Sequence, residues 1–139
     1  MKSYRPTTPS RRHMSTVSYR GVLTHGSPQK FLTKGFKRGT GRNNAGRITV
    51  RHKGGGVKRR FRDIDFMYDK KDIPAKVISV EYDPNRSGFI GLVSYVDGVK
   101  RYVLLPKTVQ PGSTFLVSEE APLIPGNRLL LKNIPVGTF

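Results

Sequence analysis

The sequence has 139 residues, a formal net charge of +17 and no cysteine. The length suits one ordinary domain or two very small ones, and the missing cysteines exclude disulfides, thiolate zinc sites and a cysteine nucleophile. Gly and Pro supply 25 of the residues, which excludes long uninterrupted helices. Apolar runs stay far below the roughly 20 residues of a membrane-spanning helix.

The positive charge is concentrated in the first half of the chain. Residues 1–62 hold 17 Lys/Arg and no acid, whereas residues 63–139 hold nine Lys/Arg and nine Asp/Glu. A segment with this density of like charge repels itself, so we expect it not to fold alone. It needs an anionic partner, either nucleic acid or an anionic membrane surface. No segment shows the amphipathic helical period that membrane binding needs, which favours nucleic acid.

Residues 1–72 are predicted to form a basic, Gly-rich arm with short strands. Prolines and glycines interrupt residues 1–46, whose apolar residues keep no period. Residues 47–52 are predicted to form a short strand, and residues 57–67 a second strand or an extended stretch.

From residue 73 the pattern predicts a small all-β barrel or sandwich that ends near residue 120. Turn residues separate short β-rich segments at close spacing, and Asp97-Gly98 is a favoured two-residue hairpin turn. The expected strands are 75–82, 89–96 and 99–105, with 111–118 and 128–131 as further candidates.

Two glycines in residues 41–48 resemble a phosphate-binding loop. Arg47 and Ile48 stand where a P-loop needs Lys and Ser/Thr, which argues against a nucleotide site. The better interpretation is that the glycines let the backbone approach RNA closely. Arg42 and Arg47 would then bind phosphates, and Asn43 and Asn44 would offer amide hydrogen bonds.

Residues 51–60 form the densest basic cluster, and glycines between the cations let the chain enter a groove. Phe61 and Tyr68 follow it and would either stack on a base or join the core. Asp63 and Asp65 come directly after Arg59, Arg60 and Arg62, so internal ion pairing is a better interpretation than a metal or catalytic pair. The three histidines are too dispersed for a zinc site, and no nucleophile elbow is present.

A free-standing OB-type single-strand binder or RNA chaperone is the alternative interpretation. It would expose several aromatic residues on one face of the barrel, and the candidates are Tyr82, Phe89, Tyr95 and Tyr102. Their solvent exposure therefore discriminates the two hypotheses. Cations on the barrel itself would offer a second RNA-binding face: Arg86, Lys100, Arg101 and Lys107.

Several motifs in one order resemble the family of bacterial-type large-subunit ribosomal protein two. The resemblance covers essentially the whole chain. Its motifs are residues 4–12 (YRPTTPSRR), 41–56 (GRNNAGRITVRHKGGG), 64–66 (IDF), 81–87 (EYDPNRS), 125–128 (PGNR) and 134–138 (IPVGT).

The resemblance implies a non-enzymatic protein of the large ribosomal subunit that organises rRNA near the peptidyl-transferase region. It implies an arm over residues 1–72 that threads into rRNA, an OB-like barrel over 73–120, and the start of an SH3-like barrel over 121–139. Family members continue beyond the position of Phe139. We therefore expect this sequence to be an N-terminal portion, whether a fragment, a split-gene product or a partial sequence.

The expected partners are large-subunit rRNA and neighbouring ribosomal proteins, with no membrane, small-molecule substrate or homo-oligomer. No cofactor is expected apart from structural Mg²⁺ held by the rRNA. The expected location is the cytoplasmic ribosome, with an organellar ribosome as the alternative, since the Arg-, Ser- and Thr-rich start also suits a transit peptide. The predicted RNA-binding residues are Arg11, Arg12, Lys34, Lys37, Arg38, Arg42, Asn43, Asn44, Arg47, Arg51, His52, Lys53, Lys58, Arg59, Arg60 and Arg86.

Overall fold

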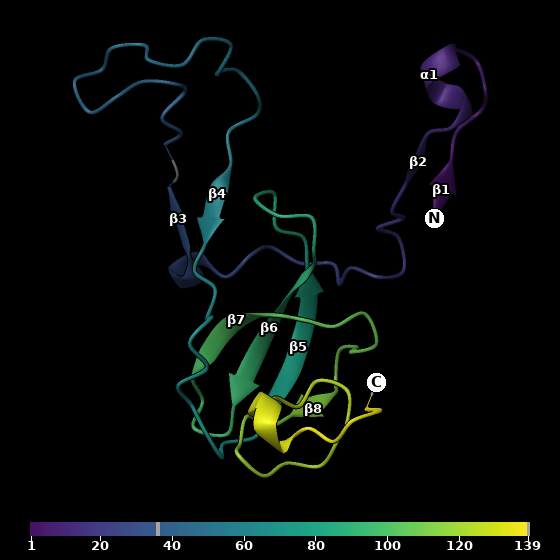
Figure 1. The fold of residues 1–139 in the computed structure, drawn as a ribbon, viewed down its shortest axis with the longest axis vertical. Helices are drawn as coiled ribbons and strands as arrows, with labels where there is room; N and C mark the ends of the chain where they lie inside the picture. The colour runs from purple at the N-terminus through teal and green to yellow at the C-terminus, as the bar shows by residue number, and fades with distance from the viewer. Residues whose placement is uncertain (36, 139) are drawn as a thin grey trace.

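A curled antiparallel sheet of four strands forms the centre of the computed structural model, which describes residues 1–35 and 37–138 (Figure 1). The expected all-β, OB-like architecture is confirmed, because strands dominate and the helices are very short. The spatial order is β7-β6-β5-β8. These strands are β5 (Ala75–Glu81), β6 (Ile90–Tyr95), β7 (Lys100–Leu104) and β8 (Thr114–Phe115), close to four of the predicted segments.

The sheet is covered on both faces, and β6 runs through its middle. Val93 and Tyr95 of β6 belong to one buried cluster, together with Phe115. Ile90 and Leu92 point to the other face and join a second cluster. Alternation along a strand sends successive side chains to opposite faces, so a strand covered on both sides is apolar almost throughout.

The hairpin between β6 and β7 differs from the predicted two-residue turn. The Gly98 amide donates to the Tyr95 carbonyl at 2.9 Å, so Val96 and Asp97 are the central turn residues. Gly98 follows with φ of +82°, in the left-handed region that glycine adopts without strain. A turn followed by such a residue gives a three-residue hairpin loop.

The strand predicted over 47–52 is wrong. Ile48 makes only an isolated bridge with Arg42. The amides of Thr49 and Val50 both donate to the Gly41 carbonyl, at 2.9 and 3.1 Å, and this contact curls the chain into a loop.

The strand predicted over 128–131 is also wrong. Arg128 makes a single parallel bridge with Val117, and the chain then turns into the 3₁₀-helix η2 (Leu131–Asn133). The amides of Asn133 and Ile134 donate back to carbonyls three residues earlier, which closes this turn instead of extending a strand.

Residues 1–62 contain two small hairpins that lie on the same side of the sheet (Figure 1). The first pairs β1 (Lys2–Ser3) with β2 (Ser15–Thr16) around the short helix α1 (Pro9–Arg12). The second pairs β3 (Thr33–Gly35) with β4 (Arg60–Arg62), after the 3₁₀-helix η1 (Lys30–Leu32). We call the β3–β4 pair the ribbon.

One tyrosine of β7 holds both ends of the ribbon. Tyr102 is completely buried, and its hydroxyl donates to Glu81 Oε2 at 2.7 Å and accepts the Gln29 amide at 2.9 Å. Its carbonyl accepts the Asp65 amide at 2.9 Å. Gln29 precedes β3 and Asp65 follows β4, so the ribbon leaves and rejoins the sheet at the same residue.

We expect Tyr102→Phe to destabilise the protein by about 1–3 kcal/mol, because the Gln29 amide and Glu81 lose a buried partner. Denaturant unfolding measures this loss, and hydrogen exchange at the Gln29 amide should accelerate. Tyr82→Phe is the control, since Tyr82 is 45% exposed. Equal stability of the two variants would contradict the role assigned to the Tyr102 hydroxyl.

We also expect stability to fall at alkaline pH. Burial raises the pKa of Tyr102 to about 12, against about 10 for an exposed tyrosine. The neutral hydroxyl is favoured in the folded state, so this stabilisation is complete below about pH 10 and is lost as the pH rises towards 12. Unfolding free energies measured across this range should fall less steeply for Tyr102→Phe than for the wild type, and identical slopes would refute the assignment.

Candidate nucleic-acid interface

The candidate interface is the loop that joins β3 to β4, residues 37–59, which we call the basic loop. It contains eight Lys/Arg and no acid. Every residue from 42 to 61 is exposed to solvent. Figure 1 shows the loop at the end of the ribbon away from the sheet. Its cations therefore face solvent without acids of the same loop to neutralise them.

Most of the predicted RNA-binding residues lie together on this loop and its ribbon. The loop carries Lys37, Arg38, Arg42, Asn43, Asn44, Arg47, Arg51, His52, Lys53, Lys58 and Arg59, and the ribbon carries Lys34 and Arg60. The other three predicted residues lie elsewhere. Arg11 and Arg12 are on α1 in the first hairpin, and Arg86 is in the turn between β5 and β6.

Backbone contacts shape the first part of the loop. The carbonyl of Gly41 accepts the two amides described above, and Asn43 and Arg47 close a smaller turn inside it. The Asn43 amide donates to the Arg47 carbonyl at 2.9 Å, and the Arg47 amide donates to Asn43 Oδ1 at 2.9 Å. The side-chain oxygen of Asn43 thus shapes the loop, whereas Asn44 lies at the exposed tip of the turn.

Arg38 connects the two limbs of the loop. Its Nη2 donates to the carbonyls of Gly55 and Val57, at 2.8 and 3.3 Å. Gly56 lies between them with φ of +81°, and a Cβ there would come within 3.0 Å of the Arg38 guanidinium. The glycine therefore permits this contact, and neutral carbonyl partners leave the positive charge of Arg38 uncompensated.

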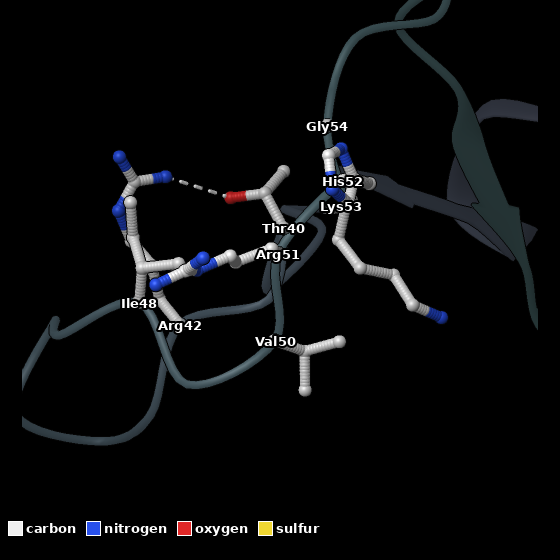
Figure 2. Close-up of a pocket in the computed structure, with 8 residues that line it drawn as sticks. All are labelled: Thr40, Arg42, Ile48, Val50, Arg51, His52, Lys53 and Gly54. Atoms are coloured by element: carbon white, nitrogen blue, oxygen red, sulfur yellow. Dashed lines mark hydrogen bonds between the residues drawn. The ribbon is translucent and has the colours of Figure 1, made fainter.

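A hollow of about 490 Å³ lies beside the turn that Asn43 and Arg47 close, and we call it the tip hollow. Figure 2 shows Arg42 hydrogen-bonded to Thr40, with the Lys53 side chain extending to the other side. The Arg42 Nη1–Thr40 Oγ1 distance is 3.0 Å. The lining residues combine cations with two aliphatic side chains: Thr40, Arg42, Ile48, Val50, Arg51, His52, Lys53 and Gly54.

A second basic hollow, of about 480 Å³, lies along the ribbon. Its lining includes Lys30, which the sequence analysis did not select, beside Lys34, Lys58, Arg59 and Arg60. Lys30 begins η1 and comes directly before β3. Lys58, Arg59 and Arg60 come far later in the chain, so no local pattern groups them with Lys30.

Several cations outside the loop and ribbon make contacts within the protein. Arg86 Nε lies 2.6 Å from Oδ2 of the fully buried Asp83, and its guanidinium stacks over Phe66. Arg101, predicted for a second RNA-binding face, pairs with Asp65 and Asp69. The Arg101 hydrogen bond lowers the pKa of the Asp69 carboxyl below its usual value.

The aspartates expected to pair internally do so, with partners other than the neighbouring arginines. Asp63 binds Lys34 across the ribbon at 2.9 Å, and Asp65 binds Arg101 of β7 at 2.6 Å. Asp65 Oδ1 also accepts the amides of Met67 and Tyr68. Strand pairing and the return of the chain to Tyr102 select these partners.

The four candidate aromatic residues do not form the exposed row that an OB-type single-strand binder needs. Tyr95 and Tyr102 are buried, Phe89 is half-buried, and Tyr82 is 45% exposed. Tyr82 and Phe89 both contact the ring of Tyr19, with centroid distances of 5.3 and 5.8 Å. These positions weigh against the alternative interpretation.

Within residues 1–35 and 37–138, no group of three or more His, Asp or Glu side chains is arranged to hold a metal ion. In the same residues, no helix is long and apolar enough to cross a membrane.

Comparison with known proteins gives two concordant matches. The family model for ribosomal proteins L2, RNA-binding N-terminal domain, matches residues 29–117. The large ribosomal subunit protein uL2 of Endomicrobium trichonymphae is 52% identical over 139 residues, which is all of this chain and 50% of that protein. The chain thus spans about half the length of this curated relative. The matched residues include the ribbon, the basic loop and the sheet, and the chain belongs to the ribosomal protein L2 family.

Proposed function

We propose that this chain is a structural, non-enzymatic constituent of the large ribosomal subunit that binds large-subunit rRNA through the basic loop. One observation carries the proposal: eight cations and no acid lie on an exposed loop, and the ribbon that carries this loop is anchored at both ends by Tyr102. The family match supports it, since the matched domain is an RNA-binding one.

Binding would draw most of its free energy from the phosphates. Each Lys or Arg that neutralises a phosphate releases condensed counterions, which makes affinity strongly dependent on salt. Arg guanidinium groups donate two parallel hydrogen bonds to phosphate oxygens and so also fix orientation. The two hollows would receive successive parts of the RNA, one at the loop tip and one along the ribbon.

The finer placement rests on the family resemblance. We propose that the rRNA site lies near the peptidyl-transferase region and that neighbouring ribosomal proteins contact the chain. The protein would act in the cytoplasmic ribosome and would need no cofactor beyond Mg²⁺ bound by the rRNA itself.

The first test is the affinity for large-subunit rRNA fragments across a salt series, with an unrelated RNA of equal length as reference. We expect a steep decrease with salt and a clear preference for the rRNA. Arg42→Gln with Arg51→Gln should reduce the salt slope by about one unit per cation. Lys76→Gln with Lys132→Gln is the matched control, because it removes the same charge away from the loop.

An unchanged slope in the Arg42/Arg51 variant would refute binding through the basic loop. Equal affinity for both RNAs would refute the preference for rRNA.

A second prediction concerns Gly41, where φ is +72° and a Cβ would lie 2.2 Å from the Val50 carbonyl oxygen. We expect Gly41→Ala to disrupt the loop and weaken rRNA binding by about tenfold or more, a difference of about 1.4 kcal/mol. Gly46→Ala is the control, because Gly46 also has positive φ, +78°, but nothing lies within 4 Å of the added Cβ. Similar losses in both variants would contradict this prediction, because they would trace the loss to the positive φ that both glycines share and not to the clash with Val50.

A further inference from the structure

We infer that the tip hollow receives one unpaired nucleotide of the RNA, with its base against Ile48 and Val50 and its phosphate at the cationic rim. This inference rests on the proposed function, since it specifies which form of RNA the basic loop recognises. It gives a role to Ile48 and Val50, two exposed aliphatic residues that phosphate binding alone does not explain.

The aliphatic residues are unusual in their surroundings. Ile48 is 62% exposed and Val50 is 50% exposed, although both lie in a loop rich in cations. Neither belongs to the buried clusters of the sheet. Both line the tip hollow, so their exposed surface is available to a ligand. Covering this surface releases water and favours a ligand with an apolar face.

The rim of the hollow supplies positive charge. Arg42 is oriented by its hydrogen bond to Thr40, and Lys53 extends on the other side (Figure 2). Arg51 also lines the hollow, and the whole loop contains no acid. The ligand should therefore carry negative charge beside its apolar face, and a nucleotide combines a phosphate with a flat base.

The backbone of the hollow is held in an uncommon conformation. Thr40 and His52 have φ of 45° and 58°, values that non-glycine residues rarely adopt, and both line the hollow. Such strained residues concentrate at binding sites because they direct groups towards a ligand.

The geometry favours an unpaired nucleotide over paired RNA. In duplex RNA the base faces are stacked, and the protein contacts phosphates and 2′-hydroxyls across a shallow groove. Ile48 and Val50 would gain little from those polar groups. The tip hollow is open to solvent, so an unpaired base that leaves the stack can enter it.

The test measures affinity for a short RNA duplex that carries a single unpaired nucleotide and for the same duplex fully paired. The wild-type protein should prefer the first RNA by about fivefold or more, roughly 1 kcal/mol. Ile48→Ser and Val50→Ser should each reduce this preference at least twofold, because they weaken binding of the RNA with the unpaired nucleotide more than binding of the paired duplex. Val57→Ser is the matched control, because Val57 is an 83% exposed aliphatic residue of the same loop that lines neither basic hollow.

The same variants can be examined on large-subunit rRNA by chemical acylation of 2′-hydroxyls. The wild type should protect at least one unpaired nucleotide that becomes reactive again with Ile48→Ser, while the other protections persist. Equal wild-type affinity for the two duplexes, or an Ile48→Ser footprint identical to the wild type, would overturn the inference. If the wild-type protein neither binds rRNA nor protects it, the proposed function itself would be overturned.

Discussion

The attachment at Tyr102 is the contact on which the rest of the arrangement depends. A ribbon of two three-residue strands is too short to be stable alone, and it carries a loop whose charges repel one another. The buried hydroxyl and the carbonyl of Tyr102 secure the chain before β3 and after β4. The sheet thereby provides the stability that the ribbon lacks, and residues 42–59 of the basic loop remain exposed.

The sheet and the loop divide the electrostatic roles between them. All nine acids follow residue 62, and several hold cations of the sheet region in ion pairs, as Asp83 holds Arg86 and Asp65 holds Arg101. In the basic loop, by contrast, Arg38 and Arg42 donate to neutral oxygens, so no negative partner offsets their positive charge. The local fold can therefore be organised by hydrogen bonds without neutralising the groups that attract RNA.

Local patterns predicted the sheet and the basic, Gly-rich segment that contains the loop, because alternation, turn residues and uneven charge are properties of short segments. They failed where distant residues decide the outcome. Ile48, Thr49 and Val50 have strand-forming side chains, yet their backbone curls around the Gly41 carbonyl. Asp65 pairs with a residue 36 positions away, and Lys30 joins its hollow only after β3 and β4 have paired. Such choices depend on the tertiary fold.

The unequal distribution of charge also gives the protein a direction. Residues 1–62 carry a formal charge of +17 and the remainder is neutral overall, while the basic loop lies at the end of the ribbon away from the sheet (Figure 1). The positive charge is therefore displaced from the sheet towards the two hairpins. A polyanion exerts a torque on such a charge distribution before any atoms touch, and turns the loop forward during the diffusional approach. Added salt shortens the screening length and weakens this orienting effect. At low ionic strength, RNA should therefore meet the basic loop first more often than random collisions would allow.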